Sequence, residues 1–441
     1  MRRLAVQVRP PAFILHMLIE SVSGMRGIVG KDLLPDVLMD RVLRFADFVG
    51  GRKFLIARDT RKSGKSIVSI IKGVLTFYGI GVYDAGIVPT PTALLYVREK
   101  DLEGGFIVTA SHNPAEYNGI KFVTGEGLFP LEWNSKGYPS YGGFAGKEFD
   151  VVDAVEFHVG RILKEFGGRR KKLRICVDTN GGAAYFALPE LLRRMGHDVI
   201  TLNSEPSGIF VHNPEPKKEH LLELDTLLQN GECDLVFGTD PDADRLICGV
   251  KGIGILSEEY TLPLALLGYG KREPRVVVNY STSMLSEFAA RKIGAEVVRT
   301  KVGEANVVNK MREVGASLGG EGNGGVIFSY INSARDSLVG AFYITLLAEN
   351  YNMEDIVAEF PEYYLVKEKV ELKENVDMAL LEKEFDADFT SREDGFYFKW
   401  NNKAWLHVRK SNTEPIVRIY AEAESEDRAR ELAAKAISII A

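Results

Sequence analysis

The chain is poor in cysteine. Three cysteines occur among its 441 residues, Cys176, Cys233 and Cys248. Their spacing fits no zinc site, and an odd number argues against a disulfide framework. Because Cys176 and Cys248 lie in apolar, strand-like runs, we interpret them as small core residues. This pattern predicts a protein of a reducing compartment, the cytoplasm.

The chain also lacks a membrane-spanning run and an excess of positive charge. No apolar stretch is long enough to cross a bilayer. With 55 basic and 61 acidic side chains the net charge is −6, which gives no overall attraction for nucleic acid. We therefore expect neither membrane nor nucleic acid as a partner. An anionic substrate would have to be held by local groups of arginine and lysine.

The first sixteen residues do not read as a secretory signal. Pro10 and Pro11 interrupt a mixed stretch where a signal peptide needs an unbroken apolar segment. We expect residues 1–16 to be a loose extension, with Met17 as a candidate natural start.

Strand-like and helix-like segments alternate through most of the chain. Apolar strand runs occupy residues 53–58, 105–109, 174–178, 235–240 and 275–279. Helical patterns separate them, for example over residues 66–78. Such alternation predicts α/β units with mainly parallel sheets, whose ligands bind at the carboxyl ends of the strands.

The last part of the chain has a different pattern. Strand-like runs at residues 395–399, 404–409 and 416–423 follow one another closely, and a helix is expected from about Glu426. This order predicts a small antiparallel α+β domain. The domains we expect are residues 17–150, 151–253, 254–361 and 362–441, three α/β units and one α+β unit packed around one cleft.

The first chemical motif follows the strand at 105–109. Residues 109–114 read Thr-Ala-Ser-His-Asn-Pro, and residues 117–121 read Tyr-Asn-Gly-Ile-Lys. Ser111 at a strand end could act as a nucleophile, with His112 and Lys121 as proton carriers. The alternative is an Asn-Pro turn capped by a serine hydroxyl. The second string at a fixed distance favours the catalytic interpretation.

The second motif is a loop of alternating carboxylates. Residues 238–245 read Gly-Thr-Asp-Pro-Asp-Ala-Asp-Arg, so that Asp240, Asp242 and Asp244 can converge on one hard cation such as magnesium. A calcium loop of the EF-hand type is less suitable, because its glycine and distal glutamate are missing. A solvated acidic turn is the other alternative.

Two further loops suggest a sugar phosphate. Residues 320–325 read Gly-Glu-Gly-Asn-Gly-Gly, and Glu321 and Asn323 can hydrogen-bond to vicinal hydroxyls of a sugar. Residues 409–415 read Arg-Lys-Ser-Asn-Thr-Glu-Pro, followed by Arg418, a combination that can cradle a phosphate. Each loop taken alone is also compatible with an ordinary turn. Arginines at position 26 and in the Arg-Asp-Thr-Arg string at 58–61 can either join the site or form surface pairs.

Together these loops resemble the α-D-phosphohexomutase family, which includes phosphoglucomutase, phosphomannomutase and phosphoglucosamine mutase. The resemblance covers the chain from about Gly24 to its end, with all four loops in the order of the family. It implies a four-domain, heart-shaped architecture around a central cleft. It also implies an isomerase that interconverts hexose or hexosamine 1-phosphate and 6-phosphate through a phosphoserine enzyme and a 1,6-bisphosphate, the sugar bisphosphate serving as activator.

The resemblance also implies roles for individual residues. Ser111 would carry the phosphoryl group, and its phosphate would bind magnesium with Asp240, Asp242 and Asp244. Lys121 would be the general acid or base. The remaining expected catalytic residues are His112, Arg245 and Arg26. The expected substrate-binding residues are Lys301, Glu321, Asn323, Arg409, Ser411, Asn412, Thr413 and Arg418.

The chain departs from common family patterns in two loops. Many members read Gly-Glu-x-Ser-Gly-His in the third loop, where this chain has Asn323 and Gly325 in place of the serine and the histidine. In the metal loop Pro241 and Ala243 fill positions that are often glycine. The choice among glucosamine, mannose and glucose phosphates therefore stays open, as does the choice between monomer and homodimer.

Two other functions compete with this one. The Asp-x-Asp-x-Asp string also suggests a magnesium-dependent phosphatase, but those enzymes carry an aspartate pair near their first strand, and none occurs here. A non-catalytic sugar-phosphate sensor would be expected to lose Ser111, Lys121 or a carboxylate, and this chain keeps them all.

Overall fold

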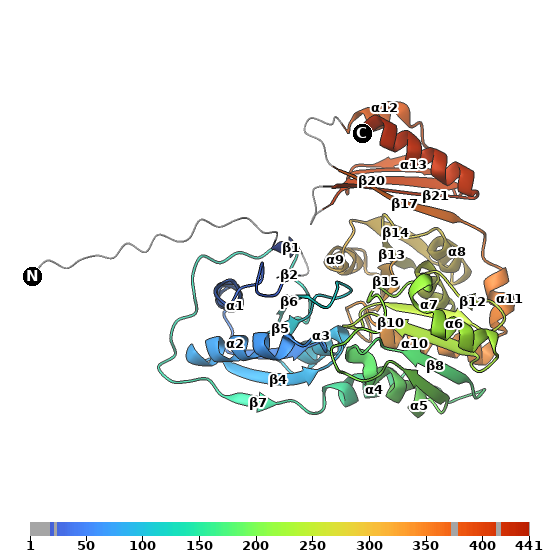
Figure 1. Ribbon diagram of the computed structural model, residues 1–441. Coiled ribbons are helices and arrows are strands. Elements are labelled where there is room, and N and C mark those ends of the chain that lie inside the picture. Colours follow the sequence, from blue (N-terminus) through green and yellow to red (C-terminus); the bar gives the residue numbers. More distant parts are fainter. Residues whose placement is uncertain (1–17, 22–23, 372–377, 412–415, 441) are drawn as a thin grey trace, which may run out of the picture.

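The computed structural model describes residues 18–21, 24–371, 378–411 and 416–440 (Figure 1). The expected N-terminal extension, residues 1–16, lies outside the described residues. Four sheets organise the chain into four successive units. Within the described residues, no helix combines the length and the apolar character needed to cross a membrane.

The first unit is a seven-stranded mixed sheet in the order β1-β2-β6-β5-β3-β4-β7. Its strands are β1 Ile19–Ser21, β2 Gly24–Ile28, β3 Lys53–Arg58, β4 Gly81–Ile87, β5 Gly104–Val108, β6 Tyr117–Thr124 and β7 Glu148–Asp150. Helices α1 (Pro35–Val49) and α2 (Gly64–Phe77) pack into one apolar core and α3 (Thr90–Glu99) into another. β3 lies parallel to β4 and β5, so the C-terminal ends of β3 and β5, with Arg58 and Val108 directly paired, meet at one edge.

The second and third units share one continuous apolar core. The second sheet has the order β12-β11-β10-β8-β9 and the third β14-β13-β15-β16. The second unit contains α4 Ala154–Leu163, β8 Arg174–Asp178, α5 Ala187–Arg194, β9 Asp198–Leu202, α6 Leu222–Gln229, β10 Leu235–Thr239, β11 Leu246–Val250 and β12 Gly254–Ile255. The third contains α7 Thr261–Tyr269, β13 Arg275–Asn279, α8 Leu285–Lys292, β14 Glu296–Thr300, α9 Glu304–Val314, β15 Leu318–Glu321, β16 Gly325–Phe328, α10 Ser337–Asn350 and α11 Met353–Ala358. Because they bury apolar surface against each other, these two units support the cleft as one body.

The fourth unit is an antiparallel sheet in the order β17-β21-β20-β19-β18. Its elements are β17 Tyr364–Glu371, α12 Leu380–Glu384, β18 Phe389–Ser391, β19 Phe396–Trp400, β20 Ala404–Lys410, β21 Ile416–Ala423 and α13 Glu426–Ile440. Helix α13 covers one face, burying a stripe of residues at helical spacing, Ala429, Leu432, Ala433, Ala436 and Ile440. Figure 1 shows this unit above the third, and an aromatic cluster with Tyr280 and Trp405 joins the two. The predicted α/β class with a C-terminal α+β unit is confirmed.

One expectation about cysteine is wrong. Cys176 and Cys233 form a disulfide, with their Cα atoms 6.0 Å apart, and the remaining thiol, Cys248, is buried. The pair escapes notice in the sequence because 57 residues separate the two cysteines. Parallel pairing of β8 with β10, in which Cys176 faces Val236, brings Cys233 beside β8. The cysteine content therefore no longer indicates a reducing compartment.

The disulfide predicts a stability loss on its removal. Because it closes a loop of 57 residues, Cys233→Ser should lower the free energy of unfolding by about 4 kcal/mol in the chain-entropy account. Urea denaturation of both proteins measures this loss. Thiol labelling of the denatured, unreduced chain should modify Cys248 alone, and labelling of all three cysteines would contradict the pairing.

Candidate active site

A cleft of about 620 Å³ opens where the four units meet. Its walls include Ser111 of the first unit, Arg245 of the second, Glu321 of the third and Arg409 of the fourth. Each sequence motif therefore contributes at least one residue to a single cavity. This volume lies within the usual range of small-molecule sites.

Ser111 lies just beyond the end of β5, on the floor of the cleft. Its backbone takes the left-handed conformation, with φ 51°, which costs a non-glycine residue about 1 kcal/mol. The hydroxyl donates a hydrogen bond to Oδ2 of Asp240 over 3.1 Å and lies 3.4 Å from Nδ1 of His112. The nucleophile candidate is thus held against the acidic loop of another unit.

The fully buried Arg61 holds the serine loop in this shape. Its guanidinium donates to the backbone carbonyls of four loop residues over 2.5–2.9 Å, those of Ser111, Asn113, Pro114 and Tyr117. Its Nε pairs with Oδ2 of Asp59 at 3.0 Å. That Asp59 oxygen also accepts from the Thr109 hydroxyl, which in turn accepts from the Ser111 amide. The Arg-Asp-Thr-Arg string is therefore structural support for Ser111 and not a surface pair.

The acidic loop after β10 gathers three buried carboxylates. One oxygen from each of Asp240, Asp242 and Asp244 lies within 4.8 Å of the others. Oδ1 of Asp240 accepts the backbone amides of Asp244 and Arg245, which closes the loop tightly. Ala243 takes φ 58° to complete the turn, a conformation that glycine adopts at lower cost.

This cluster suits a hard cation. Within the described residues, Oδ1 of Asp242 and Oδ1 of Asp244 are buried and accept no hydrogen bond. Burial and the charges of Asp244 and Asp242 raise the pKa of Asp240 well above its ordinary value. Buried, mutually repelling carboxylates with unused oxygens are the donor set that magnesium prefers. The three aspartates can therefore hold a metal ion.

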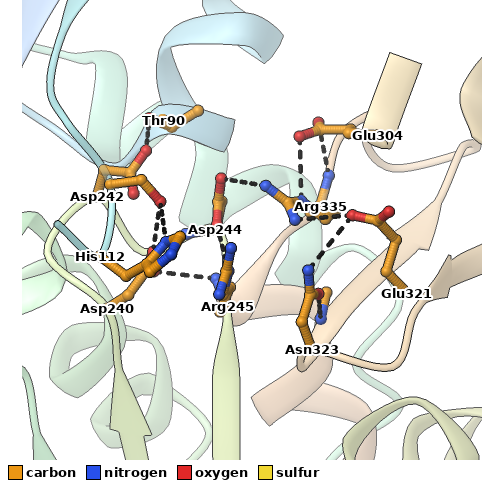
Figure 2. A network of polar contacts seen from close by, with 12 residues as sticks. Thr90, His112, Asp240, Asp242, Asp244, Arg245, Glu304, Glu321, Asn323 and Arg335 are labelled. Carbon is orange, nitrogen blue, oxygen red and sulfur yellow. Dashed lines mark hydrogen bonds and ion pairs between the residues drawn. The ribbon is translucent and has the colours of Figure 1, made fainter. Parts of the chain in front are cut away.

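Lys121 on β6 supplies positive charge to the same loop. Its Nζ lies 2.6 Å from Oδ2 of Asp242 and 2.9 Å from Oδ2 of Asp244. Burial alone would lower the pKa of Lys121, but the charges of Asp242 and Asp244 outweigh burial and raise that pKa. Lys121 is therefore protonated here and balances part of the carboxylate charge. Thr90, at the start of α3, donates to Oδ2 of Asp242 at 2.6 Å (Figure 2).

The sugar-loop candidates surround a second buried cation. Figure 2 shows Arg335 between Asp244, Glu304 and Glu321. Oε1 of Glu321 accepts from Asn279 and from the Gly303 amide, both at 2.8 Å, while its Oε2 accepts from Arg335 at 2.8 Å. Burial alone would raise the pKa of Glu321, yet the charge of Arg335 holds it below its ordinary value. Glu321 is thus an ionised acceptor on the cleft wall.

The fourth unit places three cations in one row. Lys369 of β17 pairs directly with Arg418 of β21, and Arg418 with Arg409 of β20. All three line the cleft. Directly opposite like charges repel one another, so such a row is best stabilised by an anion. It therefore forms a candidate phosphate site in the same cleft as Ser111.

Known proteins match this chain along almost its whole length. Residues 18–132, 158–254, 260–364 and 365–438 match domains I, II, III and the C-terminal domain of phosphoglucomutase/phosphomannomutase. The chain belongs to the phosphoglucomutase/phosphomannomutase family. It is accordingly an isomerase of the phosphohexomutase type.

Individual relatives agree with this assignment. The chain is 35% identical to a probable phosphoglucosamine mutase of Methanopyrus kandleri, over 95% of this chain and 96% of the relative. It is 31% identical to a phosphoglucomutase/phosphomannomutase of Thermococcus kodakarensis, over 92% and 95%. Its fold matches the crystal structure of a family protein from Burkholderia thailandensis with a TM-score of 0.83 and 24% identity, covering 95% of this chain and 97% of the other.

Further predicted site residues are brought together in the same cavity. Arg26, His112, Asn323 and Ser411 all line the cleft. Nη1 of Arg26 donates to Oδ1 of Asn113 at 2.9 Å. The charge of Arg245, with burial and Arg26, lowers the pKa of His112 well below its ordinary value, so this imidazole is neutral.

Four of the predicted residues that the structure describes do not line the cavity. Asp240, Asp242 and Asp244 are buried and contact the cavity wall through Ser111 and Lys121. Lys301 is exposed and does not line the cavity, whereas the neighbouring Val302 and Gly303 do. Asn412 and Thr413 lie outside the described residues. Their roles in binding substrate stay predictions.

Sequence reasoning missed other residues of the cavity. Arg335, Lys369 and Lys217 line it without belonging to a recognised motif. Arg335 lies in the loop between β16 and α10, and Lys369 is one of several charged residues of β17. No sequence motif around either residue indicates a binding site. For Lys369, only the pairing with Arg418 reveals a charged row.

The Arg61 network predicts a large effect on stability. Arg61→Met should lower the free energy of unfolding by about 3–5 kcal/mol, because it leaves Asp59 buried without its counter-charge. Urea denaturation tests this, with the double variant Asp59→Asn/Arg61→Met as control. We expect the double variant to lose less than the sum of the losses measured separately for Arg61→Met and Asp59→Asn. A loss below about 1 kcal/mol for Arg61→Met would contradict the proposed role of Arg61 in holding the serine loop.

Proposed function

We propose that this phosphohexomutase interconverts hexose or hexosamine 1-phosphate and 6-phosphate through a phosphorylated Ser111 and a sugar 1,6-bisphosphate. The observation that carries the proposal is the pairing of Ser111 Oγ with Asp240, one of three clustered carboxylates, on the floor of a cleft. The row of Arg409, Arg418 and Lys369 lines the same cleft. A nucleophile, a metal-binding loop and an anion-binding wall are the parts that phosphoryl transfer between two positions of one sugar requires.

The first transfer moves the phosphoryl group from Ser111 to the free hydroxyl of the sugar monophosphate. The bond between phosphorus and Ser111 Oγ breaks, a bond to the sugar oxygen forms, and the proton of that sugar hydroxyl ends on Ser111 Oγ, which becomes a hydroxyl. After the bisphosphate turns around, the other phosphoryl group moves to Ser111 Oγ, and the proton that Ser111 loses goes to the sugar oxygen left behind. The phosphorus count is therefore unchanged, and a sugar 1,6-bisphosphate can activate unphosphorylated enzyme.

The cation row would hold the phosphate that is not being transferred. Such a site must accept phosphate from either end of the sugar, since the bisphosphate binds in both orientations. Flexible arginine and lysine side chains suit this task better than a fixed pocket of neutral donors. A cleft of about 620 Å³ leaves room for the sugar to reorient without leaving.

Magnesium is the metal we propose for Asp240, Asp242 and Asp244, together with the Ser111 phosphate. When bound, it would neutralise charge on the phosphoryl oxygens. Lys121 holds two of these carboxylates in place, because its ammonium pairs with both Asp242 and Asp244. We propose that Lys121 also serves as the proton carrier for the sugar hydroxyl, since it lines the same cleft as Ser111 and a cation bound to Asp242 and Asp244 would offset the negative charge that keeps this lysine protonated.

Glucosamine phosphate is the first substrate to test. The relative from Methanopyrus kandleri is named a probable phosphoglucosamine mutase, whereas the relative from Thermococcus kodakarensis is named for glucose and mannose phosphates. A side-by-side assay of the three 1-phosphates, with magnesium and a sugar 1,6-bisphosphate, decides among them. Release of free phosphate without isomerisation would instead indicate a phosphatase, and binding without turnover a sensor.

The proposal predicts that Ser111 is indispensable. Ser111→Ala should lower mutase activity at least 1,000-fold, because no oxygen remains to carry the phosphoryl group. Mass spectrometry of the wild-type chain after incubation with the bisphosphate should find one phosphate on Ser111. Ser69→Ala, which alters an exposed serine of α2, is the matched control and should keep wild-type activity. Substantial activity in Ser111→Ala would rule out the phosphoserine route.

The metal loop yields a separate prediction. Asp242→Asn should weaken magnesium binding at least 10-fold, because it removes a charged oxygen ligand while preserving shape. Isothermal titration with magnesium measures this in the absence of substrate. Asp198→Asn, at an exposed aspartate paired with Lys172, serves as the control. Equal affinity in the Asp242 variant and wild type would show that the loop is structural only.

A further inference from the structure

Glycine at position 325 makes room for a neighbouring arginine. A Cβ atom added to Gly325 would lie 2.3 Å from Cδ and 2.8 Å from Cγ of Arg335. Both distances are shorter than real contacts of a Cβ atom. Any side chain at 325, including the histidine of many family members, would therefore collide with Arg335 in its present path. The identities of residues 325 and 335 are coupled through space.

The arginine that occupies this space connects three parts of the cleft. Its Nη2 lies 2.6 Å from Oδ2 of Asp244 in the metal loop, and its Nη1 lies 2.8 Å from Oε2 of Glu321 in the sugar loop. Its Nε lies 3.2 Å from Oε2 of Glu304 at the start of α9, whose other oxygen accepts the Arg335 amide. One guanidinium thus fixes the relative positions of carboxylates from two units.

The surroundings of Arg335 explain why an arginine is needed. The residue is 8% exposed, and its three carboxylate partners are more deeply buried still. A planar fork can donate to several carboxylates at once, whereas an ammonium on a flexible stem reaches fewer of them. Glu321 has further anchors in Asn279 and Gly303, so that Arg335 fixes the oxygen which the other two do not reach.

We propose that Arg335 is a positioning residue that orients Glu321 for the sugar hydroxyls and couples the sugar loop to the metal loop, and that Gly325 is required to admit it. The inference rests on the proposed function and deepens it, because it names the residue that sets the geometry of the sugar-binding wall. Arg335 acts through Glu321 and Asp244, and no step of phosphoryl transfer is assigned to it.

The first test keeps the positive charge of residue 335 and removes the planar guanidinium group. In Arg335→Lys, one ammonium cannot reach Asp244, Glu304 and Glu321 together. Isothermal titration with glucosamine 1-phosphate and with glucose 1-phosphate, in chelator-treated buffer that prevents turnover, measures sugar-phosphate affinity. We expect the affinity for the better ligand to fall at least 10-fold. Affinity within twofold of wild type would overturn the proposal.

The second test leaves every charge in place and displaces the arginine. Gly325→Ala should raise KM and lower kcat/KM at least 10-fold, with the far-ultraviolet circular dichroism of the wild type retained. Gly160→Ala is the matched control, because a Cβ added to this α4 glycine meets no atom within 4 Å. We expect Gly160→Ala to behave as wild type. Wild-type kinetics in Gly325→Ala would overturn the proposal.

A double-mutant cycle separates the coupling from a general loop effect. In an Arg335→Ala background Cγ and Cδ are absent, so Gly325→Ala should change kcat/KM or ligand affinity less than twofold. An effect as large as that in the wild-type background would refute the coupling of residues 325 and 335. Failure of the proposed function is distinguishable, because the wild-type chain itself would then show no mutase activity with any of the three sugar 1-phosphates.

Discussion

The cleft is organised around buried negative charge at the junction of the first three units. Asp240, Asp242 and Asp244 cluster with less than a tenth of their surface exposed. Buried carboxylates are costly unless they are paired or bind a cation. Lys121 from the first unit and Arg335 from the third both reach this loop of the second. The ion pairs that balance these carboxylates therefore join the first, second and third units at this loop.

The same junction is also held by hydrogen bonds of two threonines and by a buried histidine. The Thr90 amide donates to the backbone carbonyl of Asp242 at 2.8 Å, and the Thr90 hydroxyl donates to its carboxylate. Nearby, buried His158 of the second unit lies between the Thr92 hydroxyl of the first unit and the Asp336 carboxylate of the third. The start of α3 thus serves both the metal loop and the junction. Movement of one unit here would disturb the acidic loop directly.

The fourth unit brings the opposite charge. Its row of Lys369, Arg418 and Arg409 lines the cavity that also holds Ser111, and the Ser111 hydroxyl contacts Asp240 of the buried acidic loop. Under the proposed function, this row would bind one phosphate of the sugar, and the three aspartates would hold the metal ion that neutralises charge on the phosphoryl group at Ser111. Tyr280 and Trp405 pack between the third and fourth units, and this contact holds the row of cations in place relative to the rest of the cleft.

The α/β class, the antiparallel last unit and the four chemical loops could be predicted from the order of the amino acids. Strands such as Lys53–Arg58, Arg174–Asp178 and Arg275–Asn279 were located residue for residue, because short apolar runs are local signals. The serine loop and the acidic loop could also be predicted, since the reactive side chains of each lie within a few consecutive residues. The folded structure was needed to show which distant residues come into contact. The disulfide between Cys176 and Cys233, the clamp of Arg61 and the bridge of Arg335 join residues separated by dozens of positions or more. Strand register and packing between units place these partners together, and no local pattern encodes either one.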